Sequence, residues 1–293
     1  MSARTAASLS IVVPVFNERD SIVGLIDEIL AAEGLGDCEI VCVDDASTDD
    51  TRSLLGARAL AAPRLRVLSH TRRAGQSAAI RTGVKAARGA WIATLDGDGQ
   101  NDPADLPRLL SVRDAADADI KLIGGWRVQR RDSGSKRLAS RLANRVRGAL
   151  LRDGTPDTGC GIKLFERQAF LDLPAFDHMH RYLPALMQRA GWSTRSVPVR
   201  HRPRRAGASK YGNLSRGLAG LYDLLGVMWL IRRGKTAAAR AVAIRQGDPD
   251  GSDEPGNRDA GMDRPAHDAV EADRPGRNHA VRTALGGPVH SHP

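Results

Sequence analysis

The residue types best suited to chemistry gather in the segment TLDGDGQNDP (Thr94–Pro103). An apolar run ends directly in the pair Asp96 and Asp98, and Gln100 and Asp102 follow. Carboxylates at alternate positions on a turn can converge on a divalent ion, and Mg²⁺ or Mn²⁺ keeps one or two of them beside phosphate and water oxygens. The pattern predicts a metal site. The alternatives are an acidic turn that only caps the next helix and a calcium loop, whose later ligands are missing.

Two further expected strands also end in polar residues. SIVVPV (Ser10–Val15) leads into the tripeptide FNE, and EIVCV (Glu39–Val43) leads into Asp44 and Asp45. The carboxyl ends of parallel strands share one edge of a sheet, and ligands gather there. No glycine-rich phosphate loop follows the first strand, which argues against a Rossmann dehydrogenase, a P-loop enzyme and a sugar nucleotidyltransferase. The acidic rim suits a nucleotide held by the edge of its base, with its pyrophosphate held through metal.

The elements that must position these residues alternate along the chain. Periodicity and caps predict strands at 10–15, 39–43, 65–69 and 90–95, and helices at 19–32, 49–60 and 76–87. Further on, they predict helices at 104–116, 135–151, 167–173, 181–190 and 214–233, and strands at 120–125, 161–165 and 193–201. Such alternation predicts an α/β fold, with a mostly parallel sheet covered by helices on both faces.

The composition excludes several classes of protein. The 293 residues are 41% hydrophobic and 27% charged, as in a soluble globular protein. Three cysteines are too few for a disulfide scaffold or a cysteine-rich zinc site, so a reducing compartment is expected. No eighteen apolar residues run together, and the first ten lack the apolar stretch of a signal peptide, so neither a transmembrane helix nor a leader is predicted.

The net charge of +10 is concentrated in two segments. Residues 126–152 hold nine Arg or Lys against one acid, and residues 195–216 hold seven against none. Basic clusters of this kind favour polyanions, anionic lipid or phosphorylated ligands, and a solvated basic face is the alternative. A nucleic-acid-binding protein would need interleaved aromatic residues or a binding module, and neither segment has them.

The segment LAGLYDLLGVMWLI (Leu218–Ile231) is apolar apart from Asp223. As a helix it would span roughly 21 Å, short of the roughly 30 Å hydrocarbon core of a bilayer. Arg232 and Arg233 follow at once. These features fit a helix lying in a membrane interface, and an ordinary core helix fits equally well. After about residue 246 large apolar residues become rare, which predicts a disordered tail over 246–293.

Several motifs together resemble a known family. VVPVFNE, VDDASTDDT, the Gly75-Gln76 helix start and LDGDGQNDP are similar in order and spacing to the family-2 inverting glycosyltransferases with the GT-A fold. GGWR, DTGCGIKLF and RRAGASKYG resemble the polyprenyl-phosphate branch, to which the dolichol-phosphate mannose synthases belong. The resemblance covers about residues 8–233. It implies a nucleotide-sugar-binding half at 8–103, an acceptor half at 104–212 and a membrane-interface helix at 213–233.

The resemblance also implies roles for individual residues. Those at the strand ends would bind the nucleotide-sugar: Pro14, Phe16, Glu18, Val43, Asp45, Gly97 and Asp98. Asp96, Asp98 and Asp157 would act at the reacting centre. A Mg²⁺ or Mn²⁺ ion would be held by Asp96, Asp98 and Gln100. Phosphate oxygens would be bound by Arg127, Arg204 and Lys210. In many relatives a tyrosine stands at Phe16, so one hydroxyl contact is missing here.

The implied reaction is inverting transfer of a sugar from a nucleotide-sugar to a polyprenyl phosphate. GDP-mannose is the first choice of donor because the family's familiar members use it, and UDP-sugars remain open. A polysaccharide or protein acceptor is the alternative. The chain would act as a peripheral protein on the cytoplasmic, inner-leaflet face of the plasma membrane, alone or with a small membrane partner, and would bind no nucleic acid.

The cysteines and two histidines are expected to have structural rather than catalytic roles. Cys38, Cys42 and Cys160 are expected in the core as small buried thiols. His178 and His180, in FDHMHRY, could reach the acceptor site, but catalysis by either is the weaker alternative.

Overall fold

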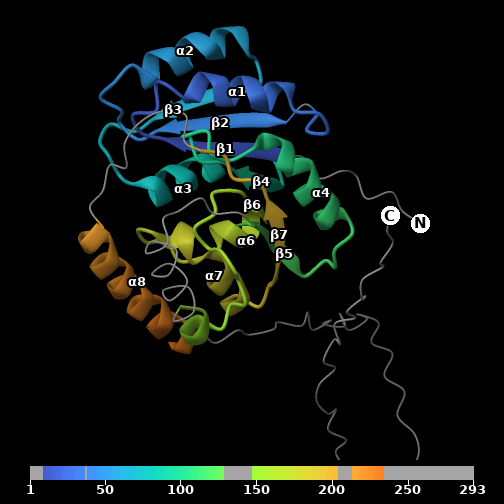
Figure 1. Cartoon of the computed structure of the whole chain (residues 1–293), viewed down its shortest axis with the longest axis vertical. Coiled ribbons are helices and arrows are strands. Elements are labelled where there is room, and N and C mark those ends of the chain that lie inside the picture. Colours follow the sequence, from blue (N-terminus) through green and yellow to red (C-terminus); the bar gives the residue numbers. More distant parts are fainter. Residues whose placement is uncertain (1–8, 37, 129–146, 204–212, 234–293) are drawn as a thin grey trace, which may run out of the picture. The chain divides into compact units, whose positions relative to one another are not determined.

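A computed structural model describes residues 9–36, 38–128, 147–203 and 213–233 (Figure 1). The strands in these ranges are β1 (Leu9–Val15), β2 (Glu39–Asp44), β3 (Leu65–Ser69), β4 (Trp91–Thr94), β5 (Ile120–Arg127), β6 (Lys163–Glu166) and β7 (Ser193–Val199). They form one sheet in the order β3-β2-β1-β4-β6-β5-β7. β6 pairs antiparallel with β4 and with β5, while every other pair is parallel. The predicted α/β fold with a mostly parallel sheet is confirmed.

Helices cover both faces of this sheet (Figure 1). They are α1 (Ile22–Ala31), α2 (Thr51–Ala61), α3 (Gln76–Ala86), α4 (Leu106–Asp114), α6 (Arg167–Leu171), α7 (Leu183–Arg189) and α8 (Asn213–Arg233), with single 3₁₀ turns η1 (Pro103–Asp105) and η2 (Met179–Arg181). Buried side chains of α1, α2 and α4 pack on one face. Those of α3, α6, α7 and α8 pack on the other.

The continuous apolar run of β1 is explained by burial on both sides. Ile11 and Val13 join the cluster under α1, whereas Val12 joins the cluster under α3, and all three are fully buried. Side chains alternate across a strand, so a central parallel strand needs apolar residues at every position. In α1, Ile22, Leu25, Ile26 and Ile29 repeat at helical spacing and are the buried residues.

Two helix starts differ from the expected ones. The helix predicted from residue 19 begins at Ile22, because the backbone amides of Ser21 and Ile22 both donate to the carbonyl of Glu18 in a tight turn. The helix predicted from residue 104 begins as η1, with Asp102 accepting from the amide of Ala104, and continues as α4. The other described elements agree with the expected ranges to within a few residues.

Some predictions fall outside the described residues. Of the basic helix expected at 135–151, residues 147–151 are helical and residues 129–146 are not described. The expected tail at 246–293 also lies outside. Among the helices that the structure describes, none combines the length and the apolar character that crossing a bilayer requires.

Candidate donor site at the strand ends

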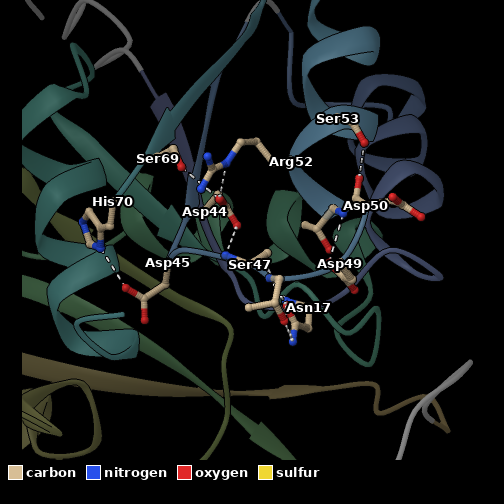
Figure 2. A network of polar contacts seen from close by, with 12 residues as sticks. Asn17, Asp44, Asp45, Ser47, Asp49, Asp50, Arg52, Ser53, Ser69 and His70 are labelled. Carbon is tan, nitrogen blue, oxygen red and sulfur yellow. Dashed lines mark hydrogen bonds and ion pairs between the residues drawn. The ribbon is translucent and has the colours of Figure 1, made fainter. Parts of the chain in front are cut away.

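The exit loops of β1 and β2 are tied to each other (Figure 2). Asn17, which has a positive φ of 54°, donates its backbone amide to Ser47 Oγ at 2.9 Å, and its side-chain oxygen accepts from the amide of Thr48 at 2.8 Å. The amide of Asp45 donates to the carbonyl of Val15 at 2.9 Å. These bonds bring the FNE tripeptide against the loop that follows β2.

Asp44 is a structural carboxylate at the end of β2. It is fully buried, and it accepts from the amide of Ser47, the hydroxyl of Ser69 and Nε of Arg52 at 3.1, 2.9 and 3.1 Å (Figure 2). Burial raises its pKa, but these hydrogen bonds outweigh burial and leave the pKa below its usual value of 3.8. Asp44 therefore fixes the loop after β2 as an ionised group.

Asp45 links β2 to the start of α3. Its carboxylate is 2.8 Å from Nδ1 of His70 and accepts from the amides of Ala74 and Gly75, each at 2.8 Å. Gly75 has a φ of 91°, which favours glycine, and an added Cβ there would lie 3.3 Å from Oδ1 of Asp177. Asp45 thus shapes the loop in front of α3, so its predicted contact with the nucleoside stays a prediction.

Phe16, Pro14 and Val43 lie around this corner of the sheet. Pro14 and Val43 are direct neighbours in the parallel register of β1 and β2, and both are buried. The guanidinium of Arg73 lies over the ring of Phe16, 4.0 Å from its centroid. This cation–π contact occupies one face of the Phe16 ring.

Asp96 and Asp98 follow β4 at the same edge. Oδ1 of Asp96 accepts from Nε2 of Gln76, at the start of α3, at 2.8 Å. Burial, followed by the nearby charge of Asp98, raises the pKa of Asp96 to about 6, and Lys163 and Arg127 oppose the rise. The charges of Asp96 and Asp98 thus repel each other, and a divalent cation bound by both carboxylates would remove that repulsion. The donor atoms present therefore fit the predicted metal.

Glycines let the chain pack closely around this pair. A Cβ on Gly97 would lie 2.7 Å from Cγ1 of Val15, and the carbonyl of Gly97 accepts from Ser21 Oγ at 2.9 Å. A Cβ on Gly161 would overlap the carboxylate of Asp96. The Asp-x-Asp loop therefore packs closely against the end of β1 on one side and against Gly161, just before β6, on the other.

Arg127 and Asp157 form a bidentate ion pair. Nε and Nη2 of Arg127 donate to the two carboxylate oxygens of Asp157 at 2.7 and 2.9 Å, and both side chains are largely buried. Burial lowers the pKa of Arg127, but the bonds to Asp157 outweigh burial and raise it. The structure thus brings two predicted site residues together as each other's partners.

The chain beyond β7 is fastened to the Asp-x-Asp loop. The amide of Arg202 donates to the carbonyl of Gln100 at 3.0 Å, and its guanidinium contacts Asp102 and Glu28, each at 2.6 Å. Nε2 of Gln100 donates in turn to the Arg202 carbonyl at 3.4 Å. Asp102 thereby serves both as the cap of η1 and as an ion-pair partner of Arg202. The predicted phosphate-binding residues Arg204 and Lys210 lie outside the described part of the chain.

The predicted metal ligands comprise two carboxylates and an amide. Within the described ranges, no three His, Cys, Asp or Glu side chains are grouped as a metal site. Asp98 is almost buried, and one of its oxygens accepts from the amide of Gln100 at 3.1 Å. The Asp96–Asp98 pair with Gln100 matches the sparse ligand set of a magnesium or manganese ion that is completed by phosphate.

The histidines and cysteines are held by structural contacts. Nδ1 of His180 is 2.7 Å from Ser77 Oγ, and burial lowers the pKa of His180 well below 6.5. Nδ1 of His178 is 2.8 Å from Asp223 of α8. The three cysteines are buried, as predicted.

Sequence reasoning missed three polar side chains of this region. Gln76 contacts Asp96, His70 contacts Asp45, and Lys163 is buried beside Asp96 and Asp157. Gln76 belongs to the Gly75-Gln76 motif, but the motif did not indicate what its side chain contacts. For Lys163 the signal was a lone charge inside the apolar strand GIKLF.

The molecule is an α/β protein whose acidic pair lies at the strand ends, where ligands bind in open α/β sheets, and comparison with known proteins shows its family. The model of glycosyl transferase family 2 matches residues 10–173. The chain belongs to this family; it is a glycosyltransferase with the GT-A fold.

Two curated relatives cover three quarters of the chain. A dodecaprenyl-phosphate galacturonate synthase of Rhizobium johnstonii is 37% identical over 233 residues, which are 76% of this chain and 67% of the relative. An undecaprenyl-phosphate 4-deoxy-4-formamido-L-arabinose transferase of Edwardsiella ictaluri is 34% identical over 229 residues, 76% of this chain and 68% of the relative. This chain thus spans about two thirds of their length.

Solved structures support the fold. A glucosyl-3-phosphoglycerate synthase of Mycobacterium tuberculosis, in complex with Mn²⁺, UDP and its product, superimposes with a TM-score of 0.60 at 21% identity, covering 80% of this chain and 83% of that one. A mannosyltransferase of Pyrobaculum calidifontis, in complex with GDP-mannose and Mn²⁺, gives 0.57 at 24% identity, covering 80% and 67%.

Proposed function

We propose that this glycosyltransferase transfers a sugar, with inversion, from a nucleotide-sugar to a polyprenyl phosphate. The observation that carries the proposal is that both relatives above are named for polyprenyl-phosphate acceptors and match three quarters of the chain. The pairing of an acidic strand end with buried cations, Arg127 and Lys163, supports it, because such a site must hold two anionic substrates.

The sugar is proposed from the same relatives. Their names specify galacturonate and 4-deoxy-4-formamido-L-arabinose, so we favour one of these two sugars over mannose. GDP-mannose, the sequence-based first choice, has no support among these two names. The proposed nucleotide carries uracil or guanine, because one solved neighbour is in complex with UDP and the other with GDP-mannose.

In the proposed mechanism, a phosphate oxygen of the acceptor attacks the anomeric carbon while the bond from that carbon to the donor diphosphate breaks. The products are the polyprenyl-phosphate sugar and a nucleoside diphosphate. The attacking phosphate is already an anion, so little help from a base is needed. A divalent ion at Asp96, Asp98 and Gln100 would offset charge on the leaving diphosphate. Asp45 and its loop would position the nucleoside, and Arg127 would orient Asp157.

The proposed location is a membrane surface, reached through α8. One face of α8 is packed on the domain, with Leu224 and Val227 buried, while Leu221, Tyr222, Leu225 and Trp229 are exposed. Arg232 and Arg233 follow in the last turn. An exposed apolar and aromatic stripe beside basic residues suits the interface of an anionic bilayer, here the cytoplasmic leaflet. A small membrane partner covering the same stripe is the alternative.

Flotation with vesicles tests the membrane proposal. Full-length protein should float with anionic vesicles, and Trp229→Glu should reduce the bound fraction at least about fivefold. Leu60→Glu is the matched control, because Leu60 of α2 is 91% exposed and lies on another helix. Equal flotation of both variants and wild type would contradict docking through α8.

A transfer assay tests the reaction. Labelled UDP- and GDP-sugars, including UDP-galacturonate and GDP-mannose, are incubated with undecaprenyl phosphate, Mn²⁺ and the protein, with EDTA as a control. Label in the lipid phase from one donor would support both reaction and acceptor. Nucleotide-sugar binding with no lipid labelling from any donor would overturn the acceptor and favour a polysaccharide or protein in its place.

A further inference from the structure

Lys163 is a buried lysine inside the sheet. It is the first residue of β6 and lies opposite Thr94 of β4 and Gly124 of β5. Only 6% of its surface is exposed, and its Nζ donates a hydrogen bond to the carbonyl of Cys160. A lysine rarely occupies such a position, because burial of an ammonium group is costly unless nearby charge compensates it.

Folding alone gives little reason for a charge at this position. The next residues of the strand, Leu164 and Phe165, are fully buried in the two apolar clusters on either side of the sheet. An apolar side chain of similar length would fill the same space without the cost of desolvation. Burial lowers the pKa of Lys163, and the nearby Cys160, Asp96 and Asp157 only partly oppose this.

The charges around Lys163 belong to the candidate donor site. Cys160, Asp96 and Asp157 are the groups that raise the pKa of Lys163, and Arg127 is the cation that lowers it. Of the two cations that favour the ionised form of Asp96, Lys163 has the larger effect. Arg127 is already bonded through two nitrogens to Asp157. Lys163 is therefore a compensating charge for Asp96 that is not engaged in the Arg127–Asp157 pair.

Lys163 also fixes the backbone beside Asp96. Its bond to the Cys160 carbonyl holds the turn that runs from Asp157 to Gly161. The carbonyl of Gly161 accepts from Thr94 Oγ1 at 2.8 Å, and there is no room for a Cβ between Gly161 and the Asp96 carboxylate. The position of this turn therefore sets the space on one side of Asp96.

We propose that Lys163 is a positioning residue of the donor site: its ammonium holds the 157–161 turn against Asp96 and balances the negative charge of Asp96 and Asp157, so that the site accepts the diphosphate of a nucleotide-sugar. This inference rests on the proposed function. Lys163 lies beneath the site and is not itself required to touch the donor.

The test measures binding rather than turnover. Titration calorimetry with UDP and with GDP, each in the presence of Mn²⁺, gives the dissociation constant for wild type, Lys163→Met and Lys163→Arg. Thermal unfolding is followed in parallel without metal. The matched control is Lys121→Met, because Lys121 is a half-buried lysine of the neighbouring strand β5 whose partners, Glu166 and Trp192, lie outside the donor site.

The inference predicts a dissociation constant at least about tenfold higher for Lys163→Met, a smaller loss for Lys163→Arg and no change for Lys121→Met. The unfolding temperature of Lys163→Met should fall, and that of Lys163→Arg should fall less, because methionine leaves the Cys160 carbonyl and the Asp96 carboxylate without this cationic partner. Binding is therefore measured at a temperature at which all variants are folded. Wild-type binding by Lys163→Met would overturn the inference. The inference would also be overturned if Lys163→Met and Lys163→Arg lost binding to the same extent and unfolded at equally lowered temperatures. That result would indicate a role in packing alone. If wild type binds neither nucleotide, the proposed function itself fails.

Discussion

Replacing Asp96 with asparagine should inactivate the protein and yet stabilise its fold. Burial and the charge of Asp98 raise the pKa of Asp96 from 3.8 to about 6. When folding raises the pKa of a carboxyl group, the group does not affect the free energy of unfolding below its unfolded pKa. The free energy of unfolding then decreases as the pH rises through the folded pKa. Above about pH 6 the ionised carboxylate therefore opposes folding.

The size of the effect follows from the shift. Each pKa unit corresponds to about 1.4 kcal/mol, so a shift of about two units costs up to about 3 kcal/mol of unfolding free energy at neutral pH. Asp96 is partly exposed, and solvent screening reduces this cost. We therefore expect Asp96→Asn to raise the free energy of unfolding by about 1 to 3 kcal/mol at pH 8, and by almost nothing at about pH 3.

Urea denaturation in EDTA, at several pH values, measures this difference. The Asp98→Asn background is the control: without the neighbouring charge the pKa of Asp96 should fall, so the gain from Asp96→Asn should shrink. An Asp96→Asn protein that is equally or less stable than wild type at pH 8 would show that Asp96 and Asp98 are not held against their mutual repulsion.

Three further substitutions test separate parts of the structure. Gly161→Ala should weaken Mn²⁺-dependent nucleotide binding at least about tenfold, because its Cβ would overlap Asp96; unchanged calorimetric binding would contradict the close packing. Phe165→Ala removes a fully buried ring stacked on Phe170 and should lower the free energy of unfolding by about 3–5 kcal/mol in urea; a loss below 1 kcal/mol would be inconsistent with this core. The lowered pKa of Asp44 gives stability that is present above its unfolded pKa and lost as the pH falls, so Asp44→Asn should flatten the acid limb of the stability curve, and an unaltered limb would argue against an ionised Asp44.

The sheet could be predicted from the sequence because its central strands are buried on both faces. Runs such as SIVVPV are apolar at successive positions, and β3 has the predicted bounds, Leu65–Ser69. Helix starts were predicted less well. The start of α1 depends on the turn at Glu18, and the start of α4 depends on the 3₁₀ turn capped by Asp102; neither leaves a clear periodic signal.

The candidate site was predictable in outline and not in its contacts. Acidic residues directly after predicted strands indicate a shared edge, which is why Asp45, Asp96 and Asp98 could be proposed together. Which partner each carboxylate selects depends on chain segments far away in sequence. Asp45 is bonded to the loop before α3, and Arg127 to Asp157, thirty residues on.

The antiparallel insertion of β6 also left no local signal. Placing β6 between β4 and β5 brings Lys163 and Gly161 to the Asp-x-Asp loop. Strand order of this kind follows from long-range pairing rather than from residue periodicity. The buried charge of Lys163 could therefore be seen in the sequence, but its proximity to Asp96 could not.

We propose that the strand ends of β1, β2 and β4 form a metal-dependent site for a nucleotide-sugar. The decisive measurement is calorimetric titration of UDP and GDP into wild type and Asp98→Asn, with Mn²⁺ and with EDTA. Wild type should bind one of these nucleotides with Mn²⁺ and at least about tenfold more weakly in EDTA, and Asp98→Asn should lose the effect of the metal. If neither Mn²⁺ nor Asp98 affected binding, the strand ends would not form such a site.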